Sequence, residues 1–77
     1  MKREEEFEKV KNIIKENIED ANLGLFFTRN IVGDHMVNIF KGEFFKIDIC
    51  YGYMYYEVFG CNIKEAEELE KYYEEIC

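Results

Sequence analysis

The 77-residue chain has no proline, tryptophan, serine or glutamine, and it has one threonine, Thr28, and one histidine, His35. Without serine, a Ser-His-Asp triad is excluded. The N-terminus, from Met1 to Glu6, lacks the apolar core of a signal peptide, and no uncharged run approaches the roughly 18 apolar residues of a membrane-spanning helix. We therefore expect a soluble, cytoplasmic protein.

Cysteine is also scarce: Cys50, Cys61 and Cys77 are widely spaced and include no CxxC pair. This pattern favours reduced thiols and predicts neither a metal site nor a cofactor. A Cys-His pair such as Cys50 with His35 is possible if the second and third strands adjoin, but a buried or strand-end cysteine is more often inert than catalytic. Composition also allows paired carboxylates, although glutamates on helix faces more often form a solvated surface. We expect no catalytic residues and therefore no enzyme.

Basic residues are in the minority, with ten Lys and Arg against seventeen Asp and Glu and a net charge of −7. This balance disfavours direct binding to nucleic acid or to an anionic membrane, so a charged partner is expected to be basic. The hydrophobic fraction of 48% and the aromatic fraction of 17% favour a folded chain. Its length predicts a single domain, residues 1–77.

Two amphipathic helices are predicted, one near each end of the chain. In residues 2–21, apolar residues recur at helical spacing opposite a row of glutamates, and Asn22 and Gly24 follow as stop signals. In residues 63–76, Ala66 begins an apolar stripe that continues to Ile76. Asn62 and Glu65 have the spacing of a capping box at the start of this second helix.

Between these helices the apolar period changes to two, which predicts four strands at about residues 23–30, 35–41, 43–50 and 53–59. Glycines at 33, 42 and 52 lie between them, at spacings typical of successive hairpins. We therefore predict an α+β fold, α-β-β-β-β-α, with a four-stranded antiparallel meander sheet packed against two helices. Two layers are the simplest packing, and a helix on each face is the alternative.

The predicted sheet has more apolar residues than one core requires. Alternation directs one set of side chains towards the helices: Leu23, Leu25, Phe27, Val37, Ile39, Phe45, Ile47, Ile49, Met54, Tyr56 and Val58. It directs a second set to the opposite face: Phe26, Met36, Phe40, Phe44, Tyr53, Tyr55 and Phe59, among the polar Thr28, Asn38, Lys46, Asp48 and Glu57. A mixed aromatic face of this kind is typical of a contact site, although a one-residue error in a turn would exchange a strand's faces.

Negative charge is concentrated near the C-terminus, where residues 61–77 hold six glutamates and two lysines. Glu67, Glu68, Glu74 and Glu75 recur at helical spacing, and such a strip of carboxylates can occupy a basic, nucleic-acid-binding groove on another protein. A role in solubility alone is the simpler alternative. With these glutamates, we predict that Tyr53, Tyr55 and Phe44 bind the partner.

In length, acidity and helix-sheet-helix layout, the chain resembles the small acidic phage-encoded anti-CRISPR inhibitor proteins, with which it shares no motif. The resemblance implies a non-enzymatic inhibitor whose acidic surface occupies the nucleic-acid-binding site of a nuclease or CRISPR effector in a bacterial host cell. The alternative is a homodimeric structural or regulatory module that associates through the aromatic sheet face. A peptide or small-molecule binder is a third hypothesis.

Overall fold

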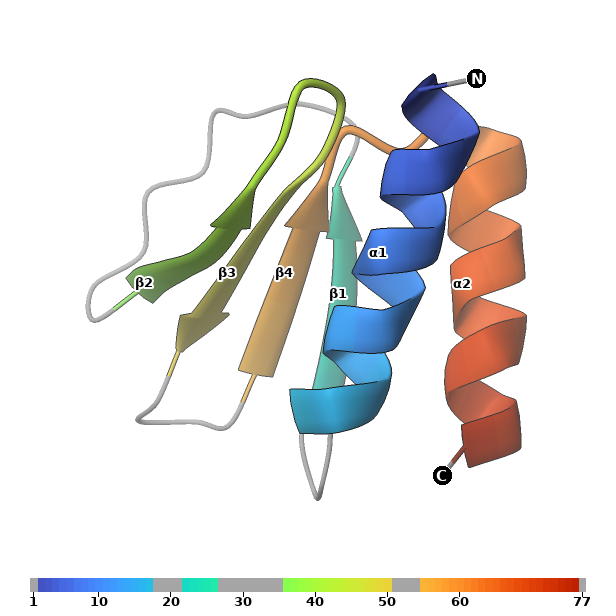
Figure 1. The fold of residues 1–77 in the computed structure, drawn as a ribbon. Coiled ribbons are helices and arrows are strands. Elements are labelled where there is room, and N and C mark those ends of the chain that lie inside the picture. Colours follow the sequence, from blue (N-terminus) through green and yellow to red (C-terminus); the bar gives the residue numbers. More distant parts are fainter. Residues whose placement is uncertain (1, 18–21, 27–35, 51–54, 77) are drawn as a thin grey trace.

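The computed structural model describes residues 2–17, 22–26, 36–50 and 55–76. The elements have the predicted order, and their bounds are α1 (Lys2–Asn17), β1 (Asn22–Phe26), β2 (Met36–Lys41), β3 (Lys46–Cys50), β4 (Tyr55–Phe59) and α2 (Ile63–Ile76) (Figure 1). The predicted α+β class is thereby confirmed. No helix among the described residues has the length and apolarity needed to cross a membrane.

The four strands form one mixed sheet with the order β1-β4-β3-β2. β2, β3 and β4 pair antiparallel as predicted, but β1 pairs parallel with β4, from Asn22 opposite Tyr55 to Phe26 opposite Phe59. The predicted all-antiparallel meander is therefore wrong. Strands that are consecutive in sequence usually pair, and the prediction followed this tendency. Nine residues separate β1 from β2, which lie at opposite edges of the sheet.

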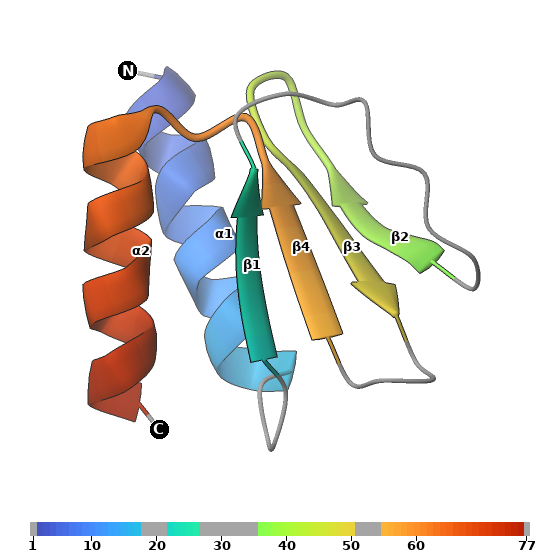
Figure 2. The same cartoon turned by 180° about the vertical axis from the view of Figure 1, so that it is seen from behind.

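Both helices run in the direction opposite to β1 and β4, so that they begin at the same end of the molecule (Figure 1). α1 lies over one face of the sheet, while α2 lies beside α1 along the β1 edge. Seen from behind, neither described helix crosses the opposite face (Figure 2). The helices therefore pack as expected for two layers.

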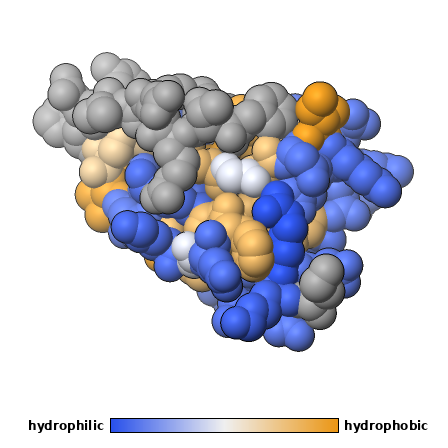
Figure 3. Space-filling model, turned by 90° about the horizontal axis from the view of Figure 1, so that it is seen from above, coloured by the Kyte–Doolittle hydropathy of each residue, from blue (hydrophilic) through white to orange (hydrophobic). Residues whose placement is uncertain are grey.

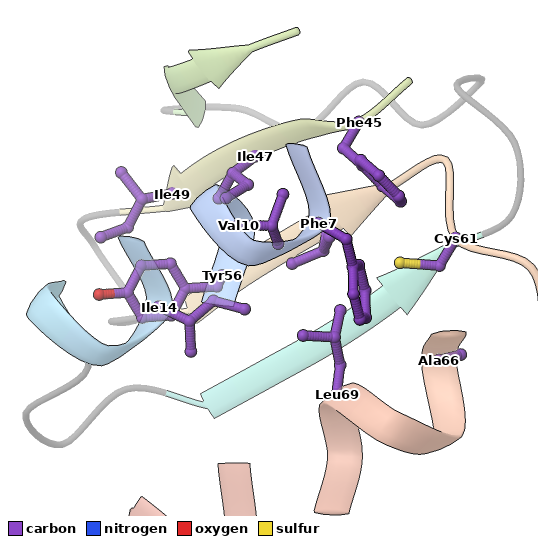
Figure 4. Close-up of a cluster of buried hydrophobic side chains, with 11 residues drawn as sticks. Phe7, Val10, Ile14, Phe45, Ile47, Ile49, Tyr56, Cys61, Ala66 and Leu69 are labelled. Atoms are coloured by element: carbon purple, nitrogen blue, oxygen red, sulfur yellow. The ribbon is translucent and has the colours of Figure 1, made fainter. Parts of the chain in front are cut away.

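The core lies between α1, α2 and the sheet face that they cover (Figure 4). The helices contribute the predicted apolar stripes, and β3 and β4 contribute alternate residues, as the period of two requires. The buried residues of this cluster are Phe7, Val10, Ile14, Phe45, Ile47, Ile49, Tyr56, Val58, Cys61, Ala66 and Leu69.

Two predicted face assignments are wrong, one because of a bulge in β2 and one because of the turn before β3. The register shifts between Asn38, which lies opposite Asp48, and Phe40, which lies opposite Ile47. Phe40 therefore packs against the helix-side cluster, as does Phe44, although both were predicted for the opposite face. Phe44 belongs to the turn before β3, so it does not follow strand alternation.

Exposure corrects a further core assignment. Val37, predicted to face the helices, is 47% exposed because β2 is the edge strand farthest from them (Figure 1). Phe27, Thr28, Tyr53 and Met54 lie outside the described residues.

Glu6 explains why β3 begins at Lys46 and not at the predicted residue 43. Its carboxylate accepts backbone N–H bonds from Glu43 and Phe44, each 2.8 Å long, and from Phe45, 2.7 Å long. These donors are thereby committed to a turn and not to a strand ladder. The interaction anchors the β2–β3 turn to α1.

Candidate protein-binding surface

The four predicted glutamates of α2 are all exposed, but they do not form one strip. Glu68 lies in a groove between α1 and α2. Glu74 lies on another side of α2, where it lines a hollow of about 340 Å³ with Glu70, Tyr73 and Leu23 of β1. Helical spacing places Glu67 on the side of Glu70 and Glu74, at positions i, i+3 and i+7. Glu70 is exposed and was not predicted as a site residue.

The groove has a volume of about 460 Å³ and lies towards the common starting end of the helices. Its lining combines an aromatic ring with four carboxylates and two ammonium groups: Glu4, Phe7, Glu8, Lys11, Asn62, Lys64, Glu65 and Glu68. Sequence reasoning did not assign Glu4 and Glu8 to the site, because the prediction did not place the helices side by side in the same direction. Their i, i+4 spacing next to Phe7 was the available signal.

Lys11 is the central cation of this groove. Its Nζ lies 3.4 Å from a carboxylate oxygen of Glu8 and 3.4 Å from one of Glu68. It also lies 5.1 Å from the ring centroid of Phe7 and 5.9 Å from that of Tyr72. Burial alone would lower the pKa of Lys11, but the charges of Glu68 and Glu8 outweigh burial and raise it. The groove therefore holds a positive group over an aromatic ring and between carboxylates.

Arg3 joins the two helices at the end of the groove. Its guanidinium donates to both oxygens of Glu65 and, at 3.0 Å, to the carbonyl of Gly60. Burial alone would raise the pKa of Glu65, but the hydrogen bonds from Arg3 and from the backbone of Asn62 lower it. The predicted capping box is confirmed, since Asn62 and Glu65 exchange hydrogen bonds of 2.8 and 2.9 Å.

The predicted aromatic anchors are not brought together. Phe44 is half-buried in the β2–β3 turn, where the guanidinium of Arg3 lies 5.4 Å from its ring centroid. Tyr55 is half-buried at the opposite end of the sheet, and its ring end occupies the space that a Cβ on Gly24 would need. Tyr53 lies outside the described residues. The only exposed large hydrophobic residues in the described ranges are Val37 and Ile63.

The face opposite α1 carries a row of cross-strand neighbours whose members on β2, β3 and β4 are polar. Asn38 of β2 lies opposite Asp48 of β3, Asp48 lies opposite Glu57 of β4, and Glu57 lies opposite Gly24 of β1. Asp48 is 7% exposed and Glu57 is 8% exposed. Alternation from Lys46 and Tyr55 had predicted these residues for this face, but not their burial.

Hydrophilic residues cover most of the described surface at the end where the helices begin, and apolar residues form separate small areas (Figure 3). Exposed glutamates of the two helices contribute to the hydrophilic surface of the described residues. We define the acidic helix surface as the following exposed glutamates of the two helices: Glu4, Glu8, Glu67, Glu68, Glu70, Glu74 and Glu75.

No protein-family model, curated protein or solved structure matches the chain.

Neither metal ligation nor thiol chemistry is indicated in the described ranges. No group of three or more His, Cys, Asp or Glu side chains there could hold a metal ion. Cys50 and Cys61 are buried thiols, and Cys77 lies outside these ranges. Burial, followed by the charge of Glu65, raises the pKa of Cys61 to about 12. The thiolate that reacts with electrophiles is therefore scarce at neutral pH.

This protection of Cys61 predicts how the protein reacts with iodoacetamide. At pH 8 we expect alkylation of Cys61 to be at least about 100-fold slower in the native protein than in urea, because the thiol is both buried and protonated. Mass spectrometry of the peptide that contains Cys61 measures both rates. Equal rates in the two conditions would show that the thiol is accessible and ionised in the native protein.

Proposed function

We propose that this protein is a non-enzymatic inhibitor that binds through the acidic helix surface to a basic, nucleic-acid-binding site of a nuclease or CRISPR effector. The observation that carries the proposal is the side-by-side arrangement of α1 and α2, which brings exposed glutamates from both ends of the chain around one groove. Glu70 and Glu74 add carboxylates on another side of α2. The net charge of −7 has the sign that steers such a protein towards a basic partner.

The local charge balance supports this surface as the contact. Lys11 is already paired with Glu8 and Glu68, while Glu67, Glu74 and Glu75 form no ion pair with a described residue. These three carboxylates stay hydrated in the unbound protein, and a partner's arginines and lysines would replace that water. Rim contacts of this type mainly accelerate association, and salt weakens them.

The groove adds a contact of a second kind. The ring of Phe7 and the carboxylates of Glu8 and Glu68 already accommodate the ammonium group of Lys11, and Glu4 lines the same groove. The same chemistry suits a lysine or arginine of the partner at the rim. Phe44 and Tyr55, which were predicted as anchors, lie at opposite ends of the sheet and do not line this groove. This mode of binding therefore does not include them.

The test is inhibition of target cleavage by purified CRISPR nucleases, measured with the wild type and with the triple variant Glu67→Lys/Glu74→Lys/Glu75→Lys. For a nuclease that the wild type inhibits, we expect the variant to lose on the order of 100-fold in affinity at low salt, because three attractive charges become repulsive. Excess guide or target nucleic acid should relieve the wild-type inhibition, since both compete for one site.

The matched control is Glu5→Lys/Glu16→Lys/Glu43→Lys, which changes the net charge equally at exposed positions outside the acidic helix surface. We expect this control to retain most of the inhibition. Equal losses in the two variants would show that net charge alone acts, and would contradict a defined surface. Failure of the wild type to inhibit any nuclease of the panel would contradict the proposed inhibitor function.

A further inference from the structure

The buried carboxyl pair of Asp48 and Glu57 lies outside the acidic helix surface. The two residues are direct cross-strand partners on β3 and β4, and both point away from the face that α1 covers. Their exposed fractions of 7% and 8% are unusual for acidic residues. If both of these neighbouring carboxyl groups ionise, the repulsion between their like charges raises the free energy of the folded protein.

Hydrogen-bond donors are distributed unequally between the two. Asp48 has two partners, the Lys46 Nζ at 3.0 Å from its Oδ2 and the Asn38 amide at 3.0 Å from its Oδ1. The Oε2 of Glu57 is buried and has no hydrogen-bond partner among the described residues. If Glu57 were ionised, this buried oxygen would share a negative charge that no hydrogen-bond donor stabilises. If Glu57 is protonated, the carboxyl group is neutral and this unfavourable buried charge is absent.

Among the described residues, the other groups on this face leave Glu57 without a donor for its Oε2. Lys46 has its ammonium group at Asp48 and over the ring of Phe59, 5.0 Å from the centroid. Its cross-strand neighbour on β2 is Lys41, which is exposed, and β1 contributes Gly24 opposite Glu57. Cys50 and Tyr55 are the remaining titratable side chains of β3 and β4 on this face.

We propose that Glu57 keeps its proton in the folded protein and that loss of this proton as the pH rises weakens the fold at the β3–β4 pair, which makes the pair a pH-sensitive device. Burial, and then the charge of Asp48, raise the pKa of Glu57 above its ordinary value of 4.5, while Lys46 opposes them. The contribution of protonated Glu57 to folding stability is fully present below the pKa of Glu57 in the unfolded chain. It is lost as the pH rises through the higher pKa of Glu57 in the folded protein.

This device is independent of the proposed inhibitor function, because it lies on the sheet face opposite α1. It predicts a protein that resists unfolding better at mildly acidic pH than at neutral pH. Glu6 and Glu65 have lowered pKa values, so their contributions increase as the pH rises, which is the opposite sign to that of Glu57.

The test compares urea unfolding of the wild type, Glu57→Gln and the exposed control Glu67→Gln between pH 4.5 and pH 8. In the wild type and the control, we expect the unfolding constant to rise over this range by about tenfold for each unit by which folding raises the Glu57 pKa. In Glu57→Gln, the part of this rise that comes from the Glu57 carboxyl group should be absent. An identical pH dependence in all three proteins would overturn the proposal.

A second measurement does not depend on whether Glu57→Gln folds. Carbon-13 NMR of the carboxyl groups in the wild type, with Glu57→Asp as an alternative variant for assignment, gives the titration of each glutamate. We expect one buried glutamate, Glu57, to titrate above 4.5. Titration of Glu57 at or below that value would equally overturn the proposal.

Discussion

Replacing Phe45 with alanine is expected to leave the protein mostly unfolded at 25 °C. Phe45 is 2% exposed, its ring centroid lies 5.5 Å from that of Phe7, and the guanidinium of Arg3 lies 4.8 Å from its centroid. Removing a buried phenylalanine costs about 3–5 kcal/mol, and a core of this size supplies only about 3–5 kcal/mol in total. Circular dichroism during urea titration measures the remaining stability.

The adjacent Phe44 offers a matched control. It has the same side chain on the same turn but is half-buried, so Phe44→Ala should lose only about 1 kcal/mol and stay folded. A Phe45→Ala protein with a cooperative transition near that of the wild type would show that the core tolerates a cavity at this position. Similar losses in both variants would contradict the difference in burial.

The second large effect is expected from Glu6, where Glu6→Ala should destabilise the protein by about 2–4 kcal/mol. A hydrogen bond to a charged group contributes about 1.5–3 kcal/mol, and three such bonds to one carboxylate do not add in full. The neighbouring Glu5→Ala, at an exposed position with no side-chain hydrogen bond to a described residue, should change stability by less than about 0.5 kcal/mol. Equal effects at the two positions would contradict the role of the turn contacts.

The pH dependence of Glu6 has the opposite sign to that of Glu57. Burial alone would raise the pKa of Glu6, but the backbone hydrogen bonds from Phe44, Phe45 and Glu43 lower it below 4.5. The stabilisation by Glu6 is therefore present above the unfolded pKa and lost as the pH falls through the folded pKa. Urea unfolding between pH 2 and pH 5 should show a decline that is smaller in Glu6→Gln. An undiminished decline in that variant would assign the acid sensitivity to other carboxyl groups.

Local patterns predicted those parts of the fold that depend on neighbouring residues. The capping box of Asn62 and Glu65 identified the start of α2, because both hydrogen bonds lie within one turn. The period of two placed Ile47 and Tyr56 on the helix side correctly. The parallel pairing of β1 with β4 was missed, since its contacts join residues more than thirty positions apart and leave no local signature.

For the candidate site, the sequence predicted which α2 residues are exposed but not how the two helices pack. Exposure of Glu67 and Glu74 follows from the helical period and was predicted. The contribution of Glu4 and Glu8 depends on the direction in which the helices pack, which periodicity does not determine. The bulge after Asn38 moved Phe40 to the other face, because a single extra residue reverses alternation.

The position of β4 between β1 and β3 also constrains the order of events during synthesis. β4 is the last strand to leave the ribosome, yet it supplies the pairing edge for β1, which emerged more than thirty residues earlier. Until then α1 and β1 have only part of the surface against which they pack, and α2 follows later still. Until β4 has been synthesised, apolar residues such as Val10 and Ile14 therefore lack part of their packing surface, and chaperones can bind such residues.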